Sequence, residues 1–311
     1  MKKILISAFA LLFSLPFVAT ASELDLTQRL HTMNKQDFSL KIPQEQRNIR
    51  LRLTLPDHTS KELPQLIIIA TGLRSQMDKA SQVALAETYQ NAGFATLQFN
   101  FMAHGENDNK SDGDMENVTL SSGITDLTAV WNYAKTLSNK VNTNDICIAA
   151  NSYGALVSLI ALEKNIINPE SMVLVSPLSL ERYKHWTVLL RLMITLMPHL
   201  ASKIFFNATP NMMWDFLRNH SNLMSKKNLL GNTAIYFLSG AQDKIAPSSD
   251  IKKWCKKFNQ ETPKDTHFIN NIQAQYKIYD NVKHFKIPAD VAKDMNKRSV
   301  EFVKKTHALK S

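Results

Sequence analysis

The chain has 311 residues, is 44% hydrophobic and contains only 8 glycines and 11 prolines. It shows no repeat of fixed period and no low-complexity tract, which excludes a repeat protein and allows one large core in one or two domains. The formal net charge is +10 at pH 7. No nucleic-acid-binding motif accompanies the basic residues, so nucleic acid is not an expected partner.

The lysine clusters are interpreted as solvated helix faces that would also suit peripheral contact with an anionic membrane surface. These clusters contain Lys252, Lys253, Lys256, Lys257, Lys304, Lys305 and Lys310.

Residues 1–21 have the pattern of a secretory signal peptide. A pair of lysines precedes a mostly apolar run at residues 4–12, and residues 19–21 (ATA) supply the small side chains of a cleavage site. We expect the mature chain to begin near Ser22 and to be periplasmic or secreted. An uncleaved membrane anchor is the alternative, but the run is shorter than the ~20 residues that a spanning helix needs. No cysteine follows the cleavage site, so a lipid anchor is not expected.

Two kinds of strand are predicted next. Residues 37–42 (DFSLKI) and 49–55 (IRLRLTL) alternate apolar and polar side chains, which predicts half-exposed strands in a hairpin at a sheet edge. Residues 66–70 (LIIIA) are continuously apolar, as expected of a strand that is covered on both faces. The spacing of Ser75 and Asp78 then predicts the capped start of a helix that runs to residue 93.

Strands and helices alternate along most of the remaining chain. Further strands are predicted over residues 94–100, 146–150, 171–177, 233–240 and 273–280, and helices over residues 125–138 and 153–164, from Ser248 or Ser249, and from Pro288. This alternation predicts the α/β class, with a mostly parallel sheet and helices on both of its faces.

The alternation is interrupted at residues 178–230, which contain long apolar segments but no convincing strand. We interpret this segment, called the cap below, as a helical insertion that divides the sheet domain into residues 22–177 and 231–311. Five methionines and five aromatic residues of the cap are expected mainly to form its own core, with some side chains reaching the mouth of the site. They are Met193, Met197, Met212, Met213, Met224, Trp186, Phe205, Phe206, Trp214 and Phe216.

The two cysteines do not indicate a disulfide framework. Cys147 falls inside an apolar strand, where a small buried hydrophobic residue is expected, and Cys255 lies in a lysine-rich helix. Neither has a metal-ligating partner at a useful spacing, so no metal site is predicted.

Ser152 stands where a predicted strand changes abruptly into a predicted helix. The surrounding residues 150–154 (ANSYG) resemble the Gly-x-Ser-x-Gly pattern of a nucleophile elbow, with Ala150 in place of the first glycine. A parallel α/β sheet carries its reactive groups at the carboxyl ends of its strands, and Ser152 follows such an end. A serine that only caps the helix is the alternative.

A nucleophilic serine needs a base and an acid that orients the base. Asp243 follows the strand at residues 233–240, and His284 follows the last predicted strand, so all three groups are expected at one edge of the sheet. Each has a plainer alternative, since Asp243 would suit a turn and His284 a surface loop. His267 is a rival base, but it precedes the last strand; His104 is expected to shape the pocket wall.

Attack on a carbonyl creates an oxyanion, which needs backbone donors held in place. The amide of Tyr153 is expected to be one, because it follows the nucleophile at a helix N-terminus. The amide of Leu73, in the loop after residues 66–70, is expected to be the other.

The order of IIIATGLRSQMD, FNFMAHGEND, AANSYGAL, SGAQDKIAP and NVKHF along the chain resembles the α/β-hydrolase superfamily. The nearest resemblance is to the serine-aminopeptidase-like and monoacylglycerol-lipase-like hydrolases. Residues 66–133 are also similar to the acyl thioesterases that supply fatty acids for bacterial bioluminescence. The resemblance implies an α/β-hydrolase fold and the roles of nucleophile, acid and base for Ser152, Asp243 and His284. The chain departs from many members where residues 70–72 (ATG) replace a His-Gly pair.

The sequence therefore predicts an exported serine hydrolase that cleaves an acyl ester or thioester of a small molecule and needs no cofactor. An acyltransferase and a serine peptidase use the same residues and stay open as alternatives. A binding protein that retains the fold without catalysis is the non-enzymatic alternative. The oligomeric state is not indicated by the sequence.

Overall fold

The computed structural model describes residues 34–57, 62–179, 187–198, 200, 208–220, 232–261 and 273–309. The predicted signal peptide and His267 lie outside the described residues. Residues 33–311 form one compact unit, distinct from residues 1–32. Within the described ranges, every helix is too short or too polar to cross a membrane.

Eight described strands form one sheet in the order β1-β2-β4-β3-β5-β6-β7-β8. β2 pairs antiparallel with β1 and β4, and the other neighbouring strands are parallel. This confirms the predicted hairpin at a sheet edge and the mostly parallel sheet. The strands are β1 (Asn34–Ile42), β2 (Arg47–Leu55), β3 (Gln65–Ala70), β4 (Ala95–Phe99), β5 (Asn142–Asn151), β6 (Ser171–Val175), β7 (Ala234–Gly240) and β8 (Ala274–Tyr279).

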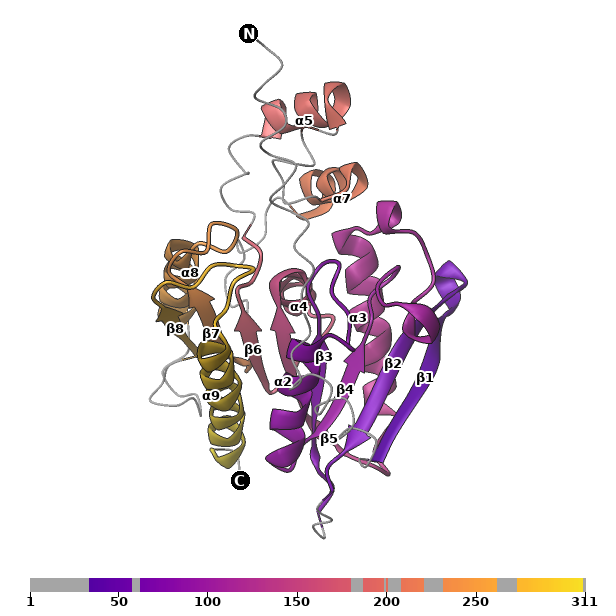
Figure 1. The fold of residues 1–311 in the computed structure, drawn as a ribbon, viewed down its shortest axis with the longest axis vertical. Helices are drawn as coiled ribbons and strands as arrows, with labels where there is room; N and C mark the ends of the chain where they lie inside the picture. The colour runs from indigo at the N-terminus through magenta and orange to yellow at the C-terminus, as the bar shows by residue number, and fades with distance from the viewer. Residues whose placement is uncertain are drawn as a thin grey trace. The chain divides into compact units, whose positions relative to one another are not determined.

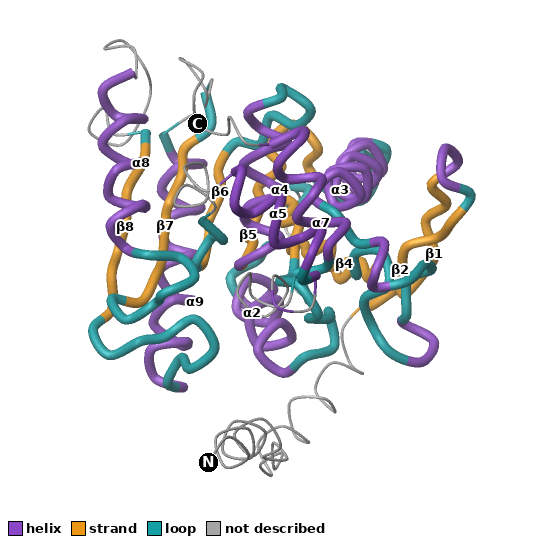
Figure 2. The backbone as a smooth tube through the Cα atoms, turned by 90° about the horizontal axis from the view of Figure 1, so that it is seen from above, coloured by secondary structure: helices purple, strands orange, loops and turns teal. Residues whose placement is uncertain are grey.

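Helices cover both faces of the sheet, as Figures 1 and 2 show. One face carries α3 (Leu120–Lys135), α4 (Ser152–Glu163) and α8 (Ser248–Glu261), and the other carries α2 (Ala80–Asn91) and α9 (Ala289–Ala308). Short 3-10 helices lie at Pro43–Glu45, Asn107–Asn109 and Met115–Asn117.

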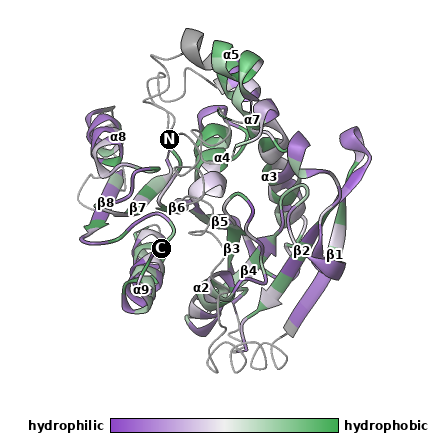
Figure 3. Ribbon diagram, turned by 45° about the horizontal axis from the view of Figure 1, so that its top comes forward, coloured by the Kyte–Doolittle hydropathy of each residue, from purple (hydrophilic) through white to green (hydrophobic). Residues whose placement is uncertain are grey.

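The alternation of side chains along β3 explains why its sequence is continuously apolar. Leu66 and Ile68 belong to the core shared with α3, α4 and α8, whereas Ile67 and Ile69 belong to the core shared with α2 and α9. Successive residues of a strand point to opposite faces, so a strand between two helical layers needs apolar residues at every position. Figure 3 shows the hydrophobic colour gathered on β3, β5 and α4, while the edge strand β1 is more hydrophilic.

Most described residues of the cap are helical. They form α5 (Thr187–Leu196), α7 (Pro210–Asp215) and a π-helical turn at Phe216–His220. The carboxylate of Asp215 accepts hydrogen bonds from the Ser121 amide at 2.7 Å and the Ser121 hydroxyl at 2.6 Å. This contact holds α7 against the first turn of α3.

The methionines of the cap divide between buried and exposed positions. Met212 and Met213 are buried with Phe216 in the same hydrophobic cluster as the sheet, α3 and α4, so these residues do not form a separate core of the cap as predicted. Met197 is 48% exposed. Met193 and Trp214 are partly buried against the same core. Trp186, Phe205, Phe206 and Met224 lie outside the described residues.

The predicted start of α2 is wrong. The helix begins at Ala80 without a side-chain cap. Asp78 instead accepts hydrogen bonds from Arg52 Nη1 at 2.6 Å and Asn109 Nδ2 at 2.8 Å. A guanidinium is a stronger partner for a carboxylate than a helix amide, so Asp78 ties its own loop to β2 and to the loop of Asn109 rather than capping the helix.

Helix α3 begins earlier than predicted because Thr119 caps it. The Thr119 hydroxyl accepts a hydrogen bond from the Ser122 amide, and the Ser122 hydroxyl accepts one from the Thr119 amide. The capping box adds a helical turn at residues 120–124, which are too polar to display the apolar spacing that predicts a helix.

Both cysteines are buried and unbridged. Cys147 lies in β5 and Cys255 in α8. The buried strand position predicted for Cys147 is confirmed.

Candidate active site

Ser152 lies at the sharp turn between β5 and α4. Its φ of +49° is in the left-handed region, which costs a residue with a side chain about 1–2 kcal/mol. The neighbouring loop braces this turn, because the Gly154 amide donates to the carbonyl of Thr71 at 3.1 Å. A Cβ at Gly154 would lie 2.5 Å from that oxygen and 2.6 Å from the Ala70 oxygen. Glycine is therefore required where α4 passes the end of β3.

The structure brings Ser152, Asp243 and His284 together. The Nε2 atom of His284 lies 2.7 Å from the Ser152 hydroxyl, and its Nδ1 atom lies 2.8 Å from a carboxylate oxygen of Asp243. Asp243 follows the end of β7 and His284 follows the end of β8. The three predicted residues therefore form one hydrogen-bonded row at the carboxyl edge of the sheet.

Asp243 is held as a buried carboxylate. One of its oxygens accepts hydrogen bonds from the amides of Ile245 at 2.9 Å and Ala246 at 2.8 Å, and the other faces His284. Burial by itself would raise the pKa of Asp243, but the hydrogen bonds from His284 and from the Ala246 amide outweigh it. The pKa of Asp243 therefore lies below its ordinary value, and the group is negatively charged at neutral pH.

The carboxylate of Asp243 fixes the tautomer of His284. A carboxylate can only accept a hydrogen bond, so the ring proton lies on Nδ1 and Nε2 carries a free lone pair. That lone pair faces the Ser152 hydroxyl. The arrangement is able to take a proton from serine and to stabilise the imidazolium that results.

The two predicted oxyanion donors belong to segments that meet at Ser152. Tyr153 is the second residue of α4, and the first amides of a helix have no partner within it. Leu73 lies in the loop of residues 71–75, where a Cβ on Gly72 would come 3.4 Å from the Ser152 Cβ. Within the described ranges, no residue accepts a hydrogen bond from the Leu73 amide. The oxyanion role of both amides remains a prediction.

The structure gives His104 a hydrogen-bonded position beside the loop of residues 71–75, and its role in the pocket wall stays a prediction. His104 is only 2% exposed, and its Nε2 atom accepts a hydrogen bond from the backbone amide of Arg74 at 2.8 Å. Its contact is therefore with the loop that carries Leu73. Sequence spacing gave no sign of this bond, because it joins two loops that only the folded sheet brings together.

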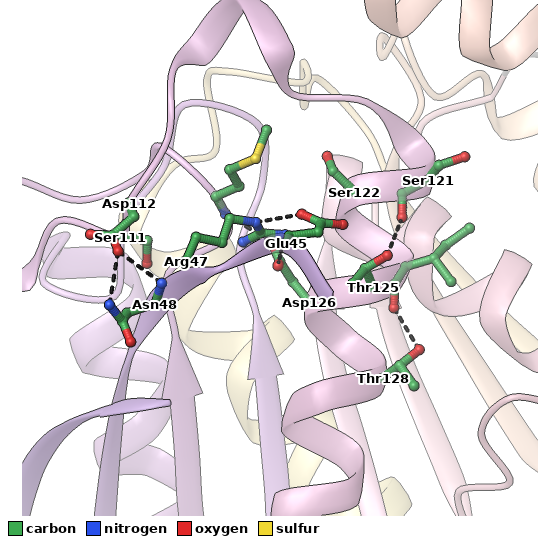
Figure 4. Close-up of polar contacts among 12 residues, drawn as sticks. Glu45, Arg47, Asn48, Ser111, Asp112, Ser121, Ser122, Thr125, Asp126 and Thr128 are labelled. Atoms are coloured by element: carbon green, nitrogen blue, oxygen red, sulfur yellow. Dashed lines mark hydrogen bonds and ion pairs between the residues drawn. The ribbon is translucent and has the colours of Figure 1, made fainter. Parts of the chain in front are cut away.

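A buried ion pair also escaped sequence analysis. Arg47 Nη2 lies 2.5 Å from Asp126 Oδ1, and the Asp126 side chain is 0% exposed. Arg47 also pairs with Glu45 (Figure 4). The other oxygen of Asp126 accepts a hydrogen bond from the Met102 amide at 2.8 Å. The pair therefore supports the loop that carries His104.

One group of potential metal ligands occurs among the described residues. Ligand atoms of Asp145, Glu170 and His307 lie within 4.8 Å of one another. Asp145 belongs to the first half of β5, at the opposite end of that strand from Ser152. These residues are therefore not part of the candidate active site.

Comparisons with known proteins agree with this architecture. Residues 35–175 match the model of a family described as acyl transferase. This match includes residues 66–133, the segment that resembles acyl thioesterases. No curated protein sequence matched the chain significantly.

Many solved structures share the fold. The chain is similar to Est1E from Butyrivibrio proteoclasticus, solved with ferulic acid, at a TM-score of 0.62 and 19% identity, covering 87% of this chain and 99% of that one. It is similar to the esterase Pf2001 from Pyrococcus furiosus at a TM-score of 0.61 and 16% identity, covering 93% and 97%. An alpha-beta serine hydrolase homologue from Coxiella burnetii is similar at a TM-score of 0.53 and 15% identity, covering 86% of this chain and 95% of that one. By its eight-stranded sheet and these likenesses, the chain is an α/β-hydrolase in fold.

Proposed function

We propose that the protein is an exported serine hydrolase that cleaves acyl esters or thioesters through a Ser152-His284-Asp243 triad and an acyl-enzyme intermediate. The observation that carries this proposal is the hydrogen-bonded row of the three side chains, with Ser152 on a strained turn at a helix N-terminus. Strain of this kind is kept where the side chain has a task.

The proposed reaction has two halves. His284 Nε2 takes the proton of the Ser152 hydroxyl while Oγ bonds to the acyl carbon, and the carbonyl oxygen becomes an oxyanion held by the amides of Leu73 and Tyr153. The carbonyl reforms, the bond to the leaving oxygen or sulfur breaks, and His284 returns its proton to that atom. Water then attacks the acyl enzyme by the same steps and releases the acid and free Ser152. No metal or organic cofactor takes part.

The acyl substrate class is supported by the comparisons. The matching family is described as acyl transferase, and two similar structures are named esterases or hold ferulic acid. Esters and thioesters both carry a carbonyl carbon bonded to a leaving oxygen or sulfur, which is the centre that Ser152 would attack. An acyltransferase is the second candidate, because the family description favours transfer of the acyl group to an acceptor other than water.

A fluorophosphonate probe tests the nucleophile. We expect it to label the protein once, at Ser152, and to leave Ser152→Ala unlabelled. Equal labelling of both proteins would exclude Ser152 as the reactive group. A protein that is folded but not labelled at all would favour the binding-protein alternative.

A panel of p-nitrophenyl acyl esters, acyl thioesters and aminoacyl amides tests the substrate class. We expect turnover of esters or thioesters of some chain length. Turnover of amides alone would indicate a peptidase, and products formed with added alcohols or amines would indicate an acyltransferase. N-terminal sequencing of the protein recovered from the periplasm or medium tests export, with a start near Ser22 expected.

A further inference from the structure

His104 connects two backbone segments through both nitrogens of its ring. Nε2 accepts a hydrogen bond from the Arg74 amide at 2.8 Å, and Nδ1 lies 2.7 Å from the carbonyl oxygen of Met102. A backbone amide can only donate and a carbonyl can only accept, so the proton lies on Nδ1 and the ring is neutral. Of the natural side chains, a neutral imidazole suits this position because it offers a donor and an acceptor on opposite sides of one rigid ring.

The Arg74 amide lies where the conformation of the predicted oxyanion loop needs support. The turn at residues 72–75 is closed by a hydrogen bond from the Ser75 amide to the Gly72 carbonyl at 3.1 Å. Arg74 is its third residue and has a φ of +57°, as the third residue of a type II turn requires. That position usually holds glycine, so an arginine there needs support from outside the turn. His104 supplies it one residue away from Leu73.

The other side of His104 is anchored in the core. The Met102 amide donates to Asp126 at 2.8 Å, and Asp126 forms the buried ion pair with Arg47. Figure 4 shows Arg47 and Asp126 meeting between β2 and α3. The His104 carbonyl accepts a further hydrogen bond from the Ser111 amide at 2.9 Å. The backbone that carries the His104 ring is therefore held in place by contacts other than the hydrogen bond to Arg74.

We propose that His104 is a positioning residue that holds the loop of residues 71–75 in the conformation that presents the Leu73 amide to the substrate oxyanion. This inference rests on the proposed function, since it assumes that Ser152 attacks a carbonyl group. Burial is the main cause of a lowered pKa for His104, which keeps the ring neutral and able to accept the bond at pH 7.

A packing role is the competing explanation for His104. Its ring stacks on Tyr153, with centroids 6.4 Å apart and planes inclined by 14°, and lies 6.1 Å from the ring of Phe101. A phenylalanine side chain would fill the same space. Only the acceptor nitrogen distinguishes the two roles, because packing alone does not require it.

The test compares His104→Phe with His104→Gln in steady-state assays on an acyl p-nitrophenyl ester. Phenylalanine keeps the ring and removes the acceptor; glutamine can place its amide oxygen near the position of Nε2. Removing an oxyanion donor outright costs about 10²–10³ in kcat, so a displaced donor in His104→Phe should cost about 10- to 100-fold. KM should change by about threefold at most, and His104→Gln should recover most of the loss.

Phe101→Leu serves as the matched packing control. Phe101 is fully buried against Tyr153 and His104 but forms no hydrogen bond to the loop. We expect its kcat to stay within about threefold of the wild type, because the hydrogen bond to Arg74 is kept. Far-UV circular dichroism and thermal unfolding of each variant exclude loss of fold as the cause, and His104→Gln carries the test if His104→Phe does not fold.

Two outcomes separate failure of this inference from failure of the proposed function. A wild-type protein that neither hydrolyses the ester nor reacts with a fluorophosphonate overturns both. An active wild type whose His104→Phe variant keeps its kcat overturns the positioning role alone. A folded His104→Gln variant as impaired as His104→Phe, or a Phe101→Leu variant equally impaired, would also contradict it.

Discussion

The Nε2 atom of His284 lies 2.7 Å from the hydroxyl of Ser152, across 132 residues of sequence. The two residues follow β8 and β5, which are separated in the sheet by β6 and β7. The loop after β8 must therefore reach back over the end of β7. It does so at Gly240, where an added Cβ would collide with the carbonyl of Val282. The Gln242 amide donates a hydrogen bond to the same carbonyl at 3.1 Å. The loop after β8 is therefore held close to the end of β7 by this bond and by the absence of a side chain at Gly240.

Gly240→Ala should displace His284 from Ser152. The new methyl group meets backbone rather than the end of a flexible side chain, so the loop has to move. We expect a loss of about 1–3 kcal/mol in the free energy of unfolding and a fall in kcat of at least about tenfold, as a misplaced base gives. Urea unfolding and ester kinetics measure the two effects.

Gly93→Ala is the control for that variant. Gly93 has a φ of +94° and open space where a Cβ would lie. Alanine there should cost about 1–2 kcal/mol of strain without changing kcat. If both variants lose the same activity, general destabilisation rather than displacement of His284 is the cause.

Asp243→Asn should leave the geometry of the site intact and reverse the tautomer of His284. The amides of Ile245 and Ala246 hold one oxygen of residue 243, so the asparagine NH₂ would face His284 Nδ1. Nδ1 must then accept, and the ring proton moves to Nε2, where it blocks proton transfer from Ser152. A fall in kcat of about 10⁴ is expected. A loss below about tenfold would argue against the role of Asp243.

Arg47→Met should destabilise the protein more at pH 7 than at pH 5. Burial raises the pKa of Asp126 to about 6, although the charge of Arg47 opposes the rise. Removing Arg47 leaves a buried carboxylate without that cation, which costs about 3–5 kcal/mol where it stays ionised. Its pKa then rises further, so at pH 5 the group is protonated and the cost is relieved. Urea unfolding at both pH values would show a constant difference from the wild type if Asp126 stayed charged.

His104 should make stability fall as the pH drops below neutrality. Burial is the largest effect on His104 and lowers its pKa below the ordinary value of 6.5. The hydrogen bond to the Met102 carbonyl opposes this shift, and the charge of Arg74 adds to it. Between that lowered pKa and 6.5 the unfolded chain binds a proton that the folded chain does not, so stability decreases with falling pH by up to about 1.4 kcal/mol per unit.

The His104→Gln variant should lack this contribution, because glutamine does not titrate. Its free energy of unfolding, measured at pH 7.5, 6.5 and 5.5, should therefore fall less than that of the wild type. Parallel pH dependences would show that His104 titrates normally in the folded protein.

The sequence by itself determined the sheet and the approximate position of the site. The apolar run of β3 and the alternation in β1 and β2 are local patterns that predict which faces of each strand are buried. The order of strands and helices then limits the ways in which the strands can be joined into a sheet. Strand ends then located Ser152, Asp243 and His284, because parallel strands present their carboxyl ends at one edge.

Only the tertiary structure decided which polar groups meet. Asp78 lies in a pattern that predicts a helix cap, yet it binds Arg52, a partner 26 residues away. The bond from Arg74 to His104 and the pair of Arg47 with Asp126 likewise join segments that no local pattern relates. Periodicity records which side of an element is buried, whereas the partner of a buried polar group depends on which loops the sheet order brings together.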